Sequence, residues 1–230
     1  MKTLFSFVSA LAFAYICIIK DWLGRGESVK FFCMVTYFII AVTALVSWRC
    51  FSRPDWMQRL ALIPFRVIRE REWYRLISHG FVHADTMHLL VNMFTFWSFG
   101  VYIEALFERV GFPLWAYPTL YFGGMVAASL YDVVKRRNNP DFVSVGASGA
   151  VSAVLFSAIF FDPWSKILLF AVVPVPGIVF GVLYLIYCQY MDKRGKDRIN
   201  HNAHFYGAVF GFLFPLFFNP SLIHLFLSYF

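Results

Sequence analysis

The sequence predicts an all-α polytopic membrane protein, a six-helix transmembrane bundle with an additional N-terminal hydrophobic helix. Of its 230 residues, 60% are hydrophobic and 14% are charged, whereas soluble domains have roughly 45 to 50% apolar and about 25% charged residues. The apolar residues also gather into runs close to the length of about 20 residues that a spanning helix needs. This composition excludes an ordinary soluble globular protein and a disordered chain.

Six apolar runs are expected to be helices, because exposed backbone groups find no hydrogen-bond partner in lipid. They cover residues 31–48, 87–103, 112–131, 143–161, 167–190 and 203–218. A seventh run, Leu4 to Ile19, contains Ala10-Leu11-Ala12, which resembles a signal-peptidase site. It could be a cleaved signal, an anchor or a span, and we favour an uncleaved helix because apolar residues continue past that site. The chain then divides into an N-terminal segment and linker (1–30), the main membrane domain (31–219) and a short apolar tail (220–230).

Two segments should depart from simple spanning helices. The longest loop, from Cys50 to about Thr86, contains the amphipathic string Leu60 to Phe65, which we expect to lie in the membrane interface. The fifth run contains Pro174, Pro176 and Gly177, which weaken helical hydrogen bonding. A kink or a break is expected there, and ordinary tolerance of proline in a membrane helix is the alternative.

The net charge of +7 could suggest nucleic acid as a partner. The Lys and Arg residues lie in short loops between apolar runs, however, where basic residues meet lipid head groups. We therefore predict membrane lipids as partners, and no nucleic acid. The cysteines, Cys17, Cys33, Cys50 and Cys188, form no CxxC pair, so neither a disulfide framework nor a thiolate metal site is indicated.

Strongly polar residues cluster near the N-terminal ends of the second, fourth and sixth runs. The second run carries His88 and Asn92, whose i, i+4 spacing puts both on one helical face. The fourth contains Gly146-Ala147-Ser148-Gly149, and the sixth opens with His201 and His204, followed by Gly207 and Gly211. Because alternate helices enter the membrane from the same side, these residues should share one side and a shallow depth.

Such a cluster can perform acyl transfer. A serine hydroxyl such as Ser148 becomes nucleophilic when a histidine takes its proton. The oxyanion that forms needs fixed donors about 3 Å away, which the Ser148 backbone N–H and the side chains of His88 and Asn92 could supply.

Each feature also has a purely structural interpretation. Ser148 alone could be a helix-packing residue, His88 a solvated interfacial histidine and Asn92 a packing hydrogen bond. Gly207 and Gly211 form a GxxxG pair that could only bring two helices close together. We expect both interpretations of this pair to hold, since close packing of the fourth and sixth helices would bring His204 to Ser148.

The motifs in this order resemble the rhomboid intramembrane serine proteases, over about residues 31–218. They are Glu72-Trp73-Tyr74-Arg75, the stretch SHGFVHADTMHLLVNM with His79, His83, His88 and Asn92, GASG at 146–149, and AHFYGAVFG at 203–211. The resemblance implies a rhomboid-like fold with Ser148 as nucleophile and His204, rather than His201, as general base. It also implies an oxyanion hole of His88, Asn92 and the Ser148 backbone. Supporting positions would be Gly146, Gly149, Gly207, Gly211 and His83, and no metal or cofactor would be needed.

The resemblance further implies that Arg75 anchors the first loop and that Glu104 ties helices together. One departure concerns the aromatic residue that the family often has four residues after the nucleophile, where this chain has Ser152. The orientation of His204 would then depend on Tyr206 or on a phenylalanine of the fourth run.

A second departure concerns orientation. The family's site usually opens to the extracytoplasmic side, but the three loops on that side hold seven arginines from Arg49 to Arg75, three basic residues at 135–137 and four at 193–198. The positive-inside rule predicts the reverse orientation. We favour the family's orientation.

The expected activity is that of a serine endopeptidase that cleaves single-span membrane proteins within or next to their membrane segment. The family implies substrate entry beside the fifth helix. The alternatives are a rhomboid-like pseudoprotease that binds membrane helices without cutting them, and a metal-dependent protease using His79, His83 and His88 with His201 and His204. The compact length suggests a multi-pass protein of a bacterial inner membrane.

Overall fold

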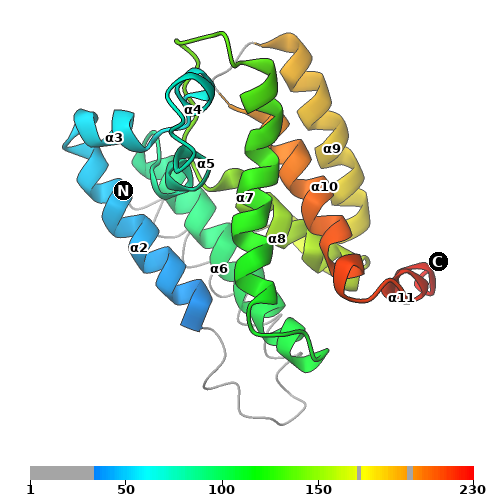
Figure 1. Ribbon diagram of the computed structural model, residues 1–230. Helices are drawn as coiled ribbons and strands as arrows, with labels where there is room; N and C mark the ends of the chain where they lie inside the picture. Colours follow the sequence, from blue (N-terminus) through cyan, green and yellow to red (C-terminus); the bar gives the residue numbers. More distant parts are fainter. Residues whose placement is uncertain (1–33, 170–171, 196–198) are drawn as a thin grey trace.

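Six long helices form the bundle, in the order of the six apolar runs (Figure 1). This computed structural model describes residues 34–169, 172–195 and 199–230. The helices are α2 (Met34–Phe51), α6 (Thr86–Arg109), α7 (Ala116–Lys135), α8 (Ser148–Phe161), α9 (Gly177–Arg194) and α10 (His201–Phe218). The expected helical bundle is confirmed, while the predicted N-terminal helix at 4–19 lies outside the described residues.

Judged singly, two of the described helices, α2 and α6, are long and apolar enough to cross a membrane. α8 is apolar but has only 14 residues. The helices α7, α9 and α10 carry polar residues at the ends next to the loops, such as Asp132, Asp192 and His201. Hydropathy alone therefore does not mark these three helices as spans. They belong to the same bundle as α2 and α6, and their polar ends lie together in it.

The short helix α8 is the centre of the bundle. Every residue from Gly149 to Phe161 is buried, as expected for a helix that is apolar on all sides. It packs against α6, α7, α9 and α10. Fourteen residues span about 21 Å, less than the roughly 30 Å of hydrocarbon core. The residues just before it, Gly146 and Ala147, are also buried, so Ser148 lies inside the bundle rather than at its end.

The fourth predicted span was wrong at its start, because the helix begins at Ser148 and not at 143. Ser144 instead pairs with Leu62 of the first loop through two backbone hydrogen bonds of 2.9 and 3.0 Å. Gly146 has φ of +115°, which a helix cannot contain. The extended approach to Ser148 thus replaces the first helical turn that hydropathy suggested.

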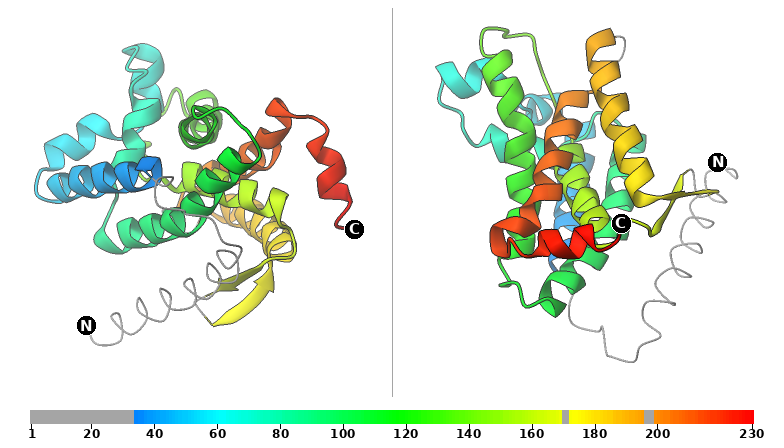
Figure 2. Two further views of the ribbon diagram at one scale, coloured as in Figure 1. Left: turned by 90° about the horizontal axis from the view of Figure 1, so that it is seen from below. Right: turned by 90° about the vertical axis from the view of Figure 1, so that its right-hand side faces the viewer.

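The fifth predicted span was also wrong in its first half. β1 (Lys166–Leu169) and β2 (Val173–Pro176) form an antiparallel ribbon in which Lys166 pairs with Pro176, and α9 begins at Gly177. The predicted break is therefore confirmed, and the prolines lie in a strand where their missing N–H is tolerated at an edge. Figure 2 shows this ribbon (yellow) projecting from the bundle at the start of α9.

The first loop folds into α3 (Pro54–Leu60), α4 (Pro64–Arg69), α5 (Arg75–Ser78) and the 3₁₀ turn η1 (His79–Phe81). The string Leu60 to Phe65 was expected in the membrane interface, but Ala61 and Leu62 are 0% and 1% exposed. Leu62 packs with Val67 of α4 and Val133 of α7. The apolar face of this string therefore packs on protein, and its depth in the membrane stays a prediction.

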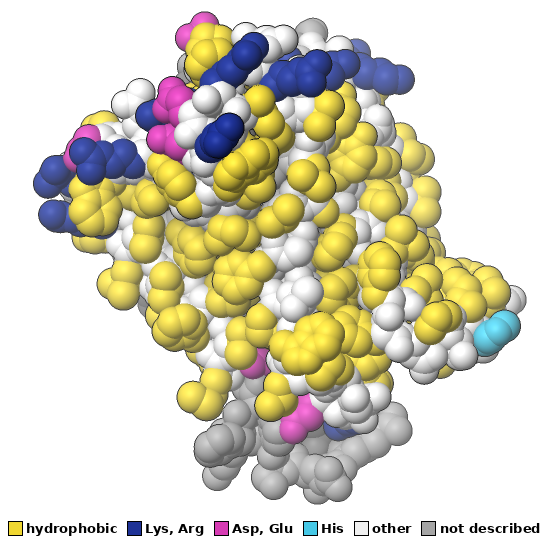
Figure 3. Space-filling view, viewed as in Figure 1, with side chains coloured by type: hydrophobic (Ala, Val, Ile, Leu, Met, Phe, Trp, Pro, Cys, Tyr) yellow, Lys and Arg dark blue, Asp and Glu magenta, His cyan; other side chains and the backbone are white. Residues whose placement is uncertain are grey.

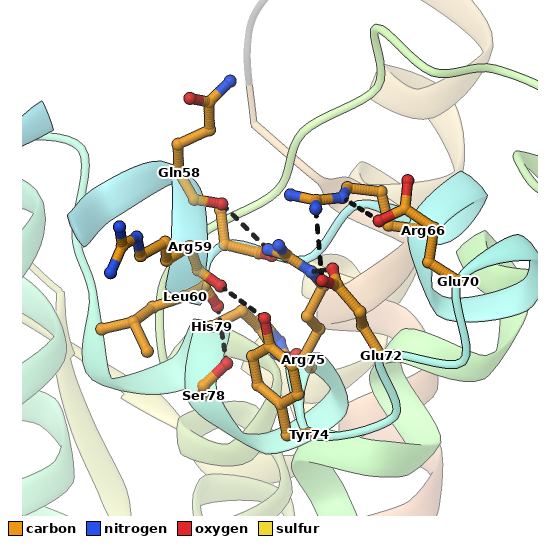
Figure 4. Close-up of polar contacts among 11 residues, drawn as sticks. Gln58, Arg59, Leu60, Arg66, Glu70, Glu72, Tyr74, Arg75, Ser78 and His79 are labelled. Carbon is orange, nitrogen blue, oxygen red and sulfur yellow. Dashed lines mark hydrogen bonds and ion pairs between the residues drawn. The ribbon is translucent and has the colours of Figure 1, made fainter. Parts of the chain in front are cut away.

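Arg75 is the anchor of this loop, as the resemblance implied. Its side chain is 1% exposed and donates hydrogen bonds to the carbonyl oxygens of Gln58 and Ala61 and to the carboxylate of Glu72 (Figure 4). The guanidinium group thus ties α5 to the end of α3 and the turn after it. A buried charge needs this degree of pairing.

Glu104 links α6 to the start of α2. Its carboxylate accepts hydrogen bonds from the backbone N–H groups of Val35 (2.9 Å) and Thr36 (3.0 Å) and from the Thr36 hydroxyl (2.6 Å). A carboxylate at a helix N-terminus satisfies otherwise unpaired donors and the positive end of the helix dipole. The structural role expected for Glu104 agrees with these contacts.

The surface has one basic end and apolar sides. Figure 3 shows Lys and Arg gathered at the end that carries α3 and α4, with hydrophobic side chains covering the flank of the bundle below it. On the opposite end, Arg109 and Lys166 are the basic residues of the described chain. The charge asymmetry noted in the sequence therefore corresponds to the two ends of the bundle, while the orientation in the membrane stays a prediction.

Candidate active site

The GASG segment is fastened to the loop that precedes α6. The backbone N–H of Gly146 donates to the carbonyl oxygen of His79 (3.0 Å), and that of Ala147 donates to Nε2 of His83 (3.4 Å). Nδ1 of His83 is 2.9 Å from the Ser47 hydroxyl, which donates to the carbonyl of Phe81. These bonds fit the neutral His83 tautomer with its proton on Nδ1, and they hold the chain just before Ser148.

Burial keeps the two loop histidines neutral. The apolar surroundings lower the pKa of His83 from 6.5 to about 3, with a smaller contribution from the neighbouring His88. Burial also lowers the pKa of His79 to about 4. Both imidazoles are therefore uncharged near pH 7, as their role as hydrogen-bond acceptors and donors within the loop requires.

His88 and Asn92 lie over Gly146. A Cβ atom at Gly146 would sit 2.6 Å from Cε1 and 2.8 Å from Nε2 of His88, and 3.7 Å from Nδ2 of Asn92. Together with the positive φ, this contact restricts the position to glycine. His88 lies in the first turn of α6, where its backbone N–H donates to the carboxylate of the N-cap residue Asp85 (2.8 Å). The expected shared face of His88 and Asn92 is present, and it points at the turn before Ser148.

The amide nitrogen of Asn92 is a buried donor for which no described residue provides an acceptor. Asn92 is 6% exposed. Leaving a buried donor unpaired costs roughly 1 to 3 kcal/mol, so native structures rarely retain one without a role. This donor lies beside the GASG segment, where an oxyanion formed at Ser148 would need it.

α8 and α10 touch backbone to backbone below Ser148. A side-chain carbon at Gly207 would overlap the carbonyl oxygen of Gly149, and one at Gly211 would overlap the backbone of Ala153. His204 lies three residues before Gly207, about one helical turn. The turns that carry Ser148 and His204 therefore lie next to each other, and both side chains are half-buried.

The aromatic neighbour of His204 comes from α9. The ring of Tyr184 is parallel to the imidazole at 6.2 Å, and its hydroxyl is 3.0 Å from that of Ser152. Of the candidates expected to orient His204, Tyr206 instead stacks on Tyr131 (5.0 Å). Among the phenylalanines of the fourth run, Phe156 packs against Tyr184 (5.7 Å). No sequence spacing pointed to Tyr184, because it belongs to another helix.

A small polar cavity adjoins Ser148 on its inner side. Its volume is about 10 Å³, about that of a single water-sized sphere. Polar residues in its lining are His79, Ser129, Ser144, Ser148 and Asn200. The Asn200 amide donates to the buried carboxylate of Asp132 and to the Ser144 hydroxyl.

The sequence did not single out Asp132, Ser129 or Asn200. Asp132 comes directly after the apolar run 112–131. A charged residue at that position was the one signal in the sequence that could have revealed the hydrogen-bond network of Asp132, Asn200 and Ser144.

The five-histidine metal site considered from the sequence is not assembled. In the described chain, the one group of three potential metal ligands within reach of one another is Cys188, His201 and His204. His79 and His83 instead lie in the first loop, and His88 lies in the first turn of α6. The alternative of a metal-dependent protease therefore gains no support from the geometry.

Comparison with known proteins identifies similar chains. The family model described as Rhomboid domain matches residues 70–221. The chain is 28% identical to RHOMBOID-like protein 12, mitochondrial, of Arabidopsis thaliana, over 71% of this chain and 52% of that protein. It is 27% identical to the putative rhomboid protease YdcA of Bacillus subtilis, over 78% and 85%. It is also 34% identical to Rhomboid protein 1, mitochondrial, of Saccharomyces cerevisiae, over 44% and 29%. The chain thus spans about half the length of the first of these relatives.

Proposed function

The chain belongs to the rhomboid family, and we propose that it is an intramembrane serine endopeptidase that cleaves single-span membrane proteins within or next to their membrane segment. The observation that carries the proposal is the unpaired amide donor of Asn92, buried beside Gly146 together with the His88 ring. A buried donor beside the GASG segment suits an enzyme, because such a donor can stabilise an oxyanion formed at Ser148.

In the proposed reaction, Ser148 and His204 act as a dyad. His204 takes the proton from the Ser148 hydroxyl as the oxygen attacks the scissile carbonyl carbon. The carbonyl oxygen becomes an oxyanion that accepts hydrogen bonds from the Ser148 backbone N–H, His88 and Asn92. When the C–N bond breaks, His204 returns the proton to the leaving amine, and the acyl group remains on Ser148 as an ester.

Hydrolysis of that ester requires a water molecule near Ser148. The polar cavity beside Ser148 has the size for about one water. His204 does not line this cavity, so a water molecule stored there would first move to the ester. His204 would then take a proton from the water as its oxygen attacks the ester carbon, and would return that proton to the serine oxygen as the second product leaves. Ser129 and Asn200 would hold the water by hydrogen bonds.

Entry of a substrate beside α9 is supported by the thin packing of that helix. Its buried residues are Gly177, Gly181 and Cys188, whereas apolar side chains such as Leu183 (59%) and Ile186 (60%) are exposed. A helix with so few fully buried residues can move aside at a lower energetic cost. A substrate helix must also unwind locally, because a helical amide is shielded and hydrogen-bonded.

The second candidate function is that of a rhomboid-like pseudoprotease, which would bind membrane helices and leave them intact. We give it second place because Ser148 and His204 are both retained and their helical turns are adjacent.

We also propose a multi-pass location in a cellular membrane. The Arabidopsis and yeast relatives cited above are named as mitochondrial, so the comparisons do not support the bacterial inner membrane expected from the sequence.

The test is cleavage of a model single-span substrate in proteoliposomes. Wild type should release two fragments, and Ser148→Ala and His204→Ala should reduce the rate by a factor of at least about a thousand, as expected for loss of a nucleophile or its base. Tyr206→Phe, on the same helix as His204, serves as the matched control and should retain activity. A wild type that binds the substrate without cutting it would favour the pseudoprotease.

A further inference from the structure

A compact group of metal-binding side chains lies behind the proposed general base. It consists of Cys188 on α9 with His201 and His204 on α10. The sulfur and one nitrogen of each imidazole lie within 4.8 Å of one another. The sequence alone did not reveal this group, because Cys188 and His201 belong to different helices.

The three residues form a half-enclosed site. Cys188 is 1% exposed and His201 is 3% exposed, while His204 is half-buried. The rings of His201 and His204 are 6.1 Å apart at 75°, since residues three apart share one helical face. The edge of Tyr187 covers His201, with ring centroids 5.6 Å apart. The ligands thus face each other across the contact between α9 and α10.

The donor set selects the kind of ion. A thiolate with two imidazoles suits borderline ions such as Zn²⁺, whereas Mg²⁺ and Ca²⁺ take oxygen ligands. Zinc bonds of about 2.3 Å to sulfur and about 2.0 to 2.1 Å to nitrogen put the ligand atoms of a tetrahedron roughly 3.3 to 3.6 Å apart. Movement of side chains on the order of 1 Å would therefore close the site. The fourth position would remain for a water molecule.

We propose that Cys188, His201 and His204 bind Zn²⁺, and that the bound ion inhibits the enzyme because a dication on the His204 imidazole opposes the positive charge that this ring gains when it accepts the Ser148 proton. The thiol of Cys188 loses its proton to solvent as the sulfur coordinates the ion, and both imidazoles bind as neutral ligands. Apart from the S–H bond of Cys188, which forms again when the ion leaves, no covalent bond of the protein breaks, so a chelator reverses the inhibition. The ion is an inhibitor and takes no part in peptide hydrolysis.

The binding half of this proposal can be tested without any protease activity. Full-length Ser148→Ala protein in detergent is titrated with Co²⁺, whose thiolate complexes show a charge-transfer absorption band. The band should saturate at one ion per chain, disappear in Cys188→Ser and be displaced by Zn²⁺. Cys50→Ser, which removes another buried cysteine, is the matched control and should keep the band. Absence of the band, or its persistence in Cys188→Ser, would overturn the site.

The inhibitory half rests on the proposed function and needs cleavage assays. At free Zn²⁺ ten times its Kd, wild-type activity should fall to about one-eleventh by mass action and return when a chelator is added. The Cys188→Ser variant should cleave at nearly the same rate with and without Zn²⁺, and these two rates should differ by no more than about twofold. If saturating Zn²⁺ leaves wild-type cleavage unchanged, the inhibition is refuted. A wild type that never cleaves would refute the protease function instead, while the Co²⁺ titration still decides the site.

Discussion

The phenol ring of Tyr184 lies parallel to the imidazole of His204, with 6.2 Å between ring centroids and 11° between planes. The Tyr184 hydroxyl is held by that of Ser152 at 3.0 Å. In this chain, Ser152 occupies the position four residues after Ser148 where the family often has an aromatic residue. The small side chain leaves room for a ring from α9, and the hydroxyl fixes that ring. A helix proposed to admit the substrate thus also carries the ring that stacks on the proposed base.

We predict that Tyr184→Ala lowers kcat about tenfold with little change in KM. The stacked ring and the hydroxyl each contribute roughly 0.5 to 1.5 kcal/mol to holding the imidazole. Tyr184→Phe keeps the ring and should lose only about threefold. The measurement is steady-state cleavage of a fluorogenic substrate, with thermal unfolding as a check on folding. Wild-type kcat in Tyr184→Ala would show that the ring does not position His204.

Asn92 should matter for rate and not for stability. Asn92→Leu removes the unpaired buried amide donor and keeps a similar volume, so the free energy of unfolding should stay the same or increase. The rate should fall by about a hundredfold, as expected for one oxyanion donor. Cleavage kinetics and Tm in detergent are compared for this variant and wild type. A lower Tm with normal kcat would assign Asn92 a packing role instead.

Acid should destabilise the fold through the loop histidines. The folded-state pKa is about 3 for His83 and about 4 for His79, whereas a histidine in the unfolded chain has a pKa of about 6.5. Below pH 6.5 the unfolded chain therefore binds more protons than the folded chain. Stability is therefore highest above pH 6.5 and decreases as the pH falls toward 4. Thermal unfolding from pH 7 to pH 4 measures this, and His83→Gln should show a shallower decrease. An identical slope in both proteins would contradict the assigned neutral state of His83.

The contact between α8 and α10 should tolerate no added carbon. Gly207→Ala places a methyl group against the Gly149 carbonyl, so the helices must separate, which costs about 1 to 3 kcal/mol. The shift also moves His204 and should lower kcat. Leu213→Ala, on the exposed side of the same helix, should change the stability by no more than about 0.5 kcal/mol. Equal stability of Gly207→Ala and wild type, measured by thermal unfolding, would refute the close contact.

Hydropathy predicted the helices, because it is a pattern within single segments, and the order of the helices predicted the side on which the polar residues meet. The GxxxG spacing of Gly207 and Gly211 likewise predicted a close helix contact from local pattern alone. The strands at 166–176 escaped notice, since an apolar run rich in β-branched residues reads equally as strand or helix.

The contacts of Tyr184 and Cys188 with α10 could not be found from the sequence. Each depends on which helices become neighbours, and that is determined by packing over the whole bundle rather than by local spacing.

The dyad itself can be tested by covalent labelling with a fluorophosphonate, which reacts with an activated serine. Labelling of the wild-type protein in detergent, mapped by mass spectrometry, should place one adduct on Ser148. His204→Ala should slow the labelling by a factor of at least about a hundred, consistent with loss of the general base. An adduct on another residue, or equal labelling rates in wild type and His204→Ala, would contradict a serine nucleophile activated by His204.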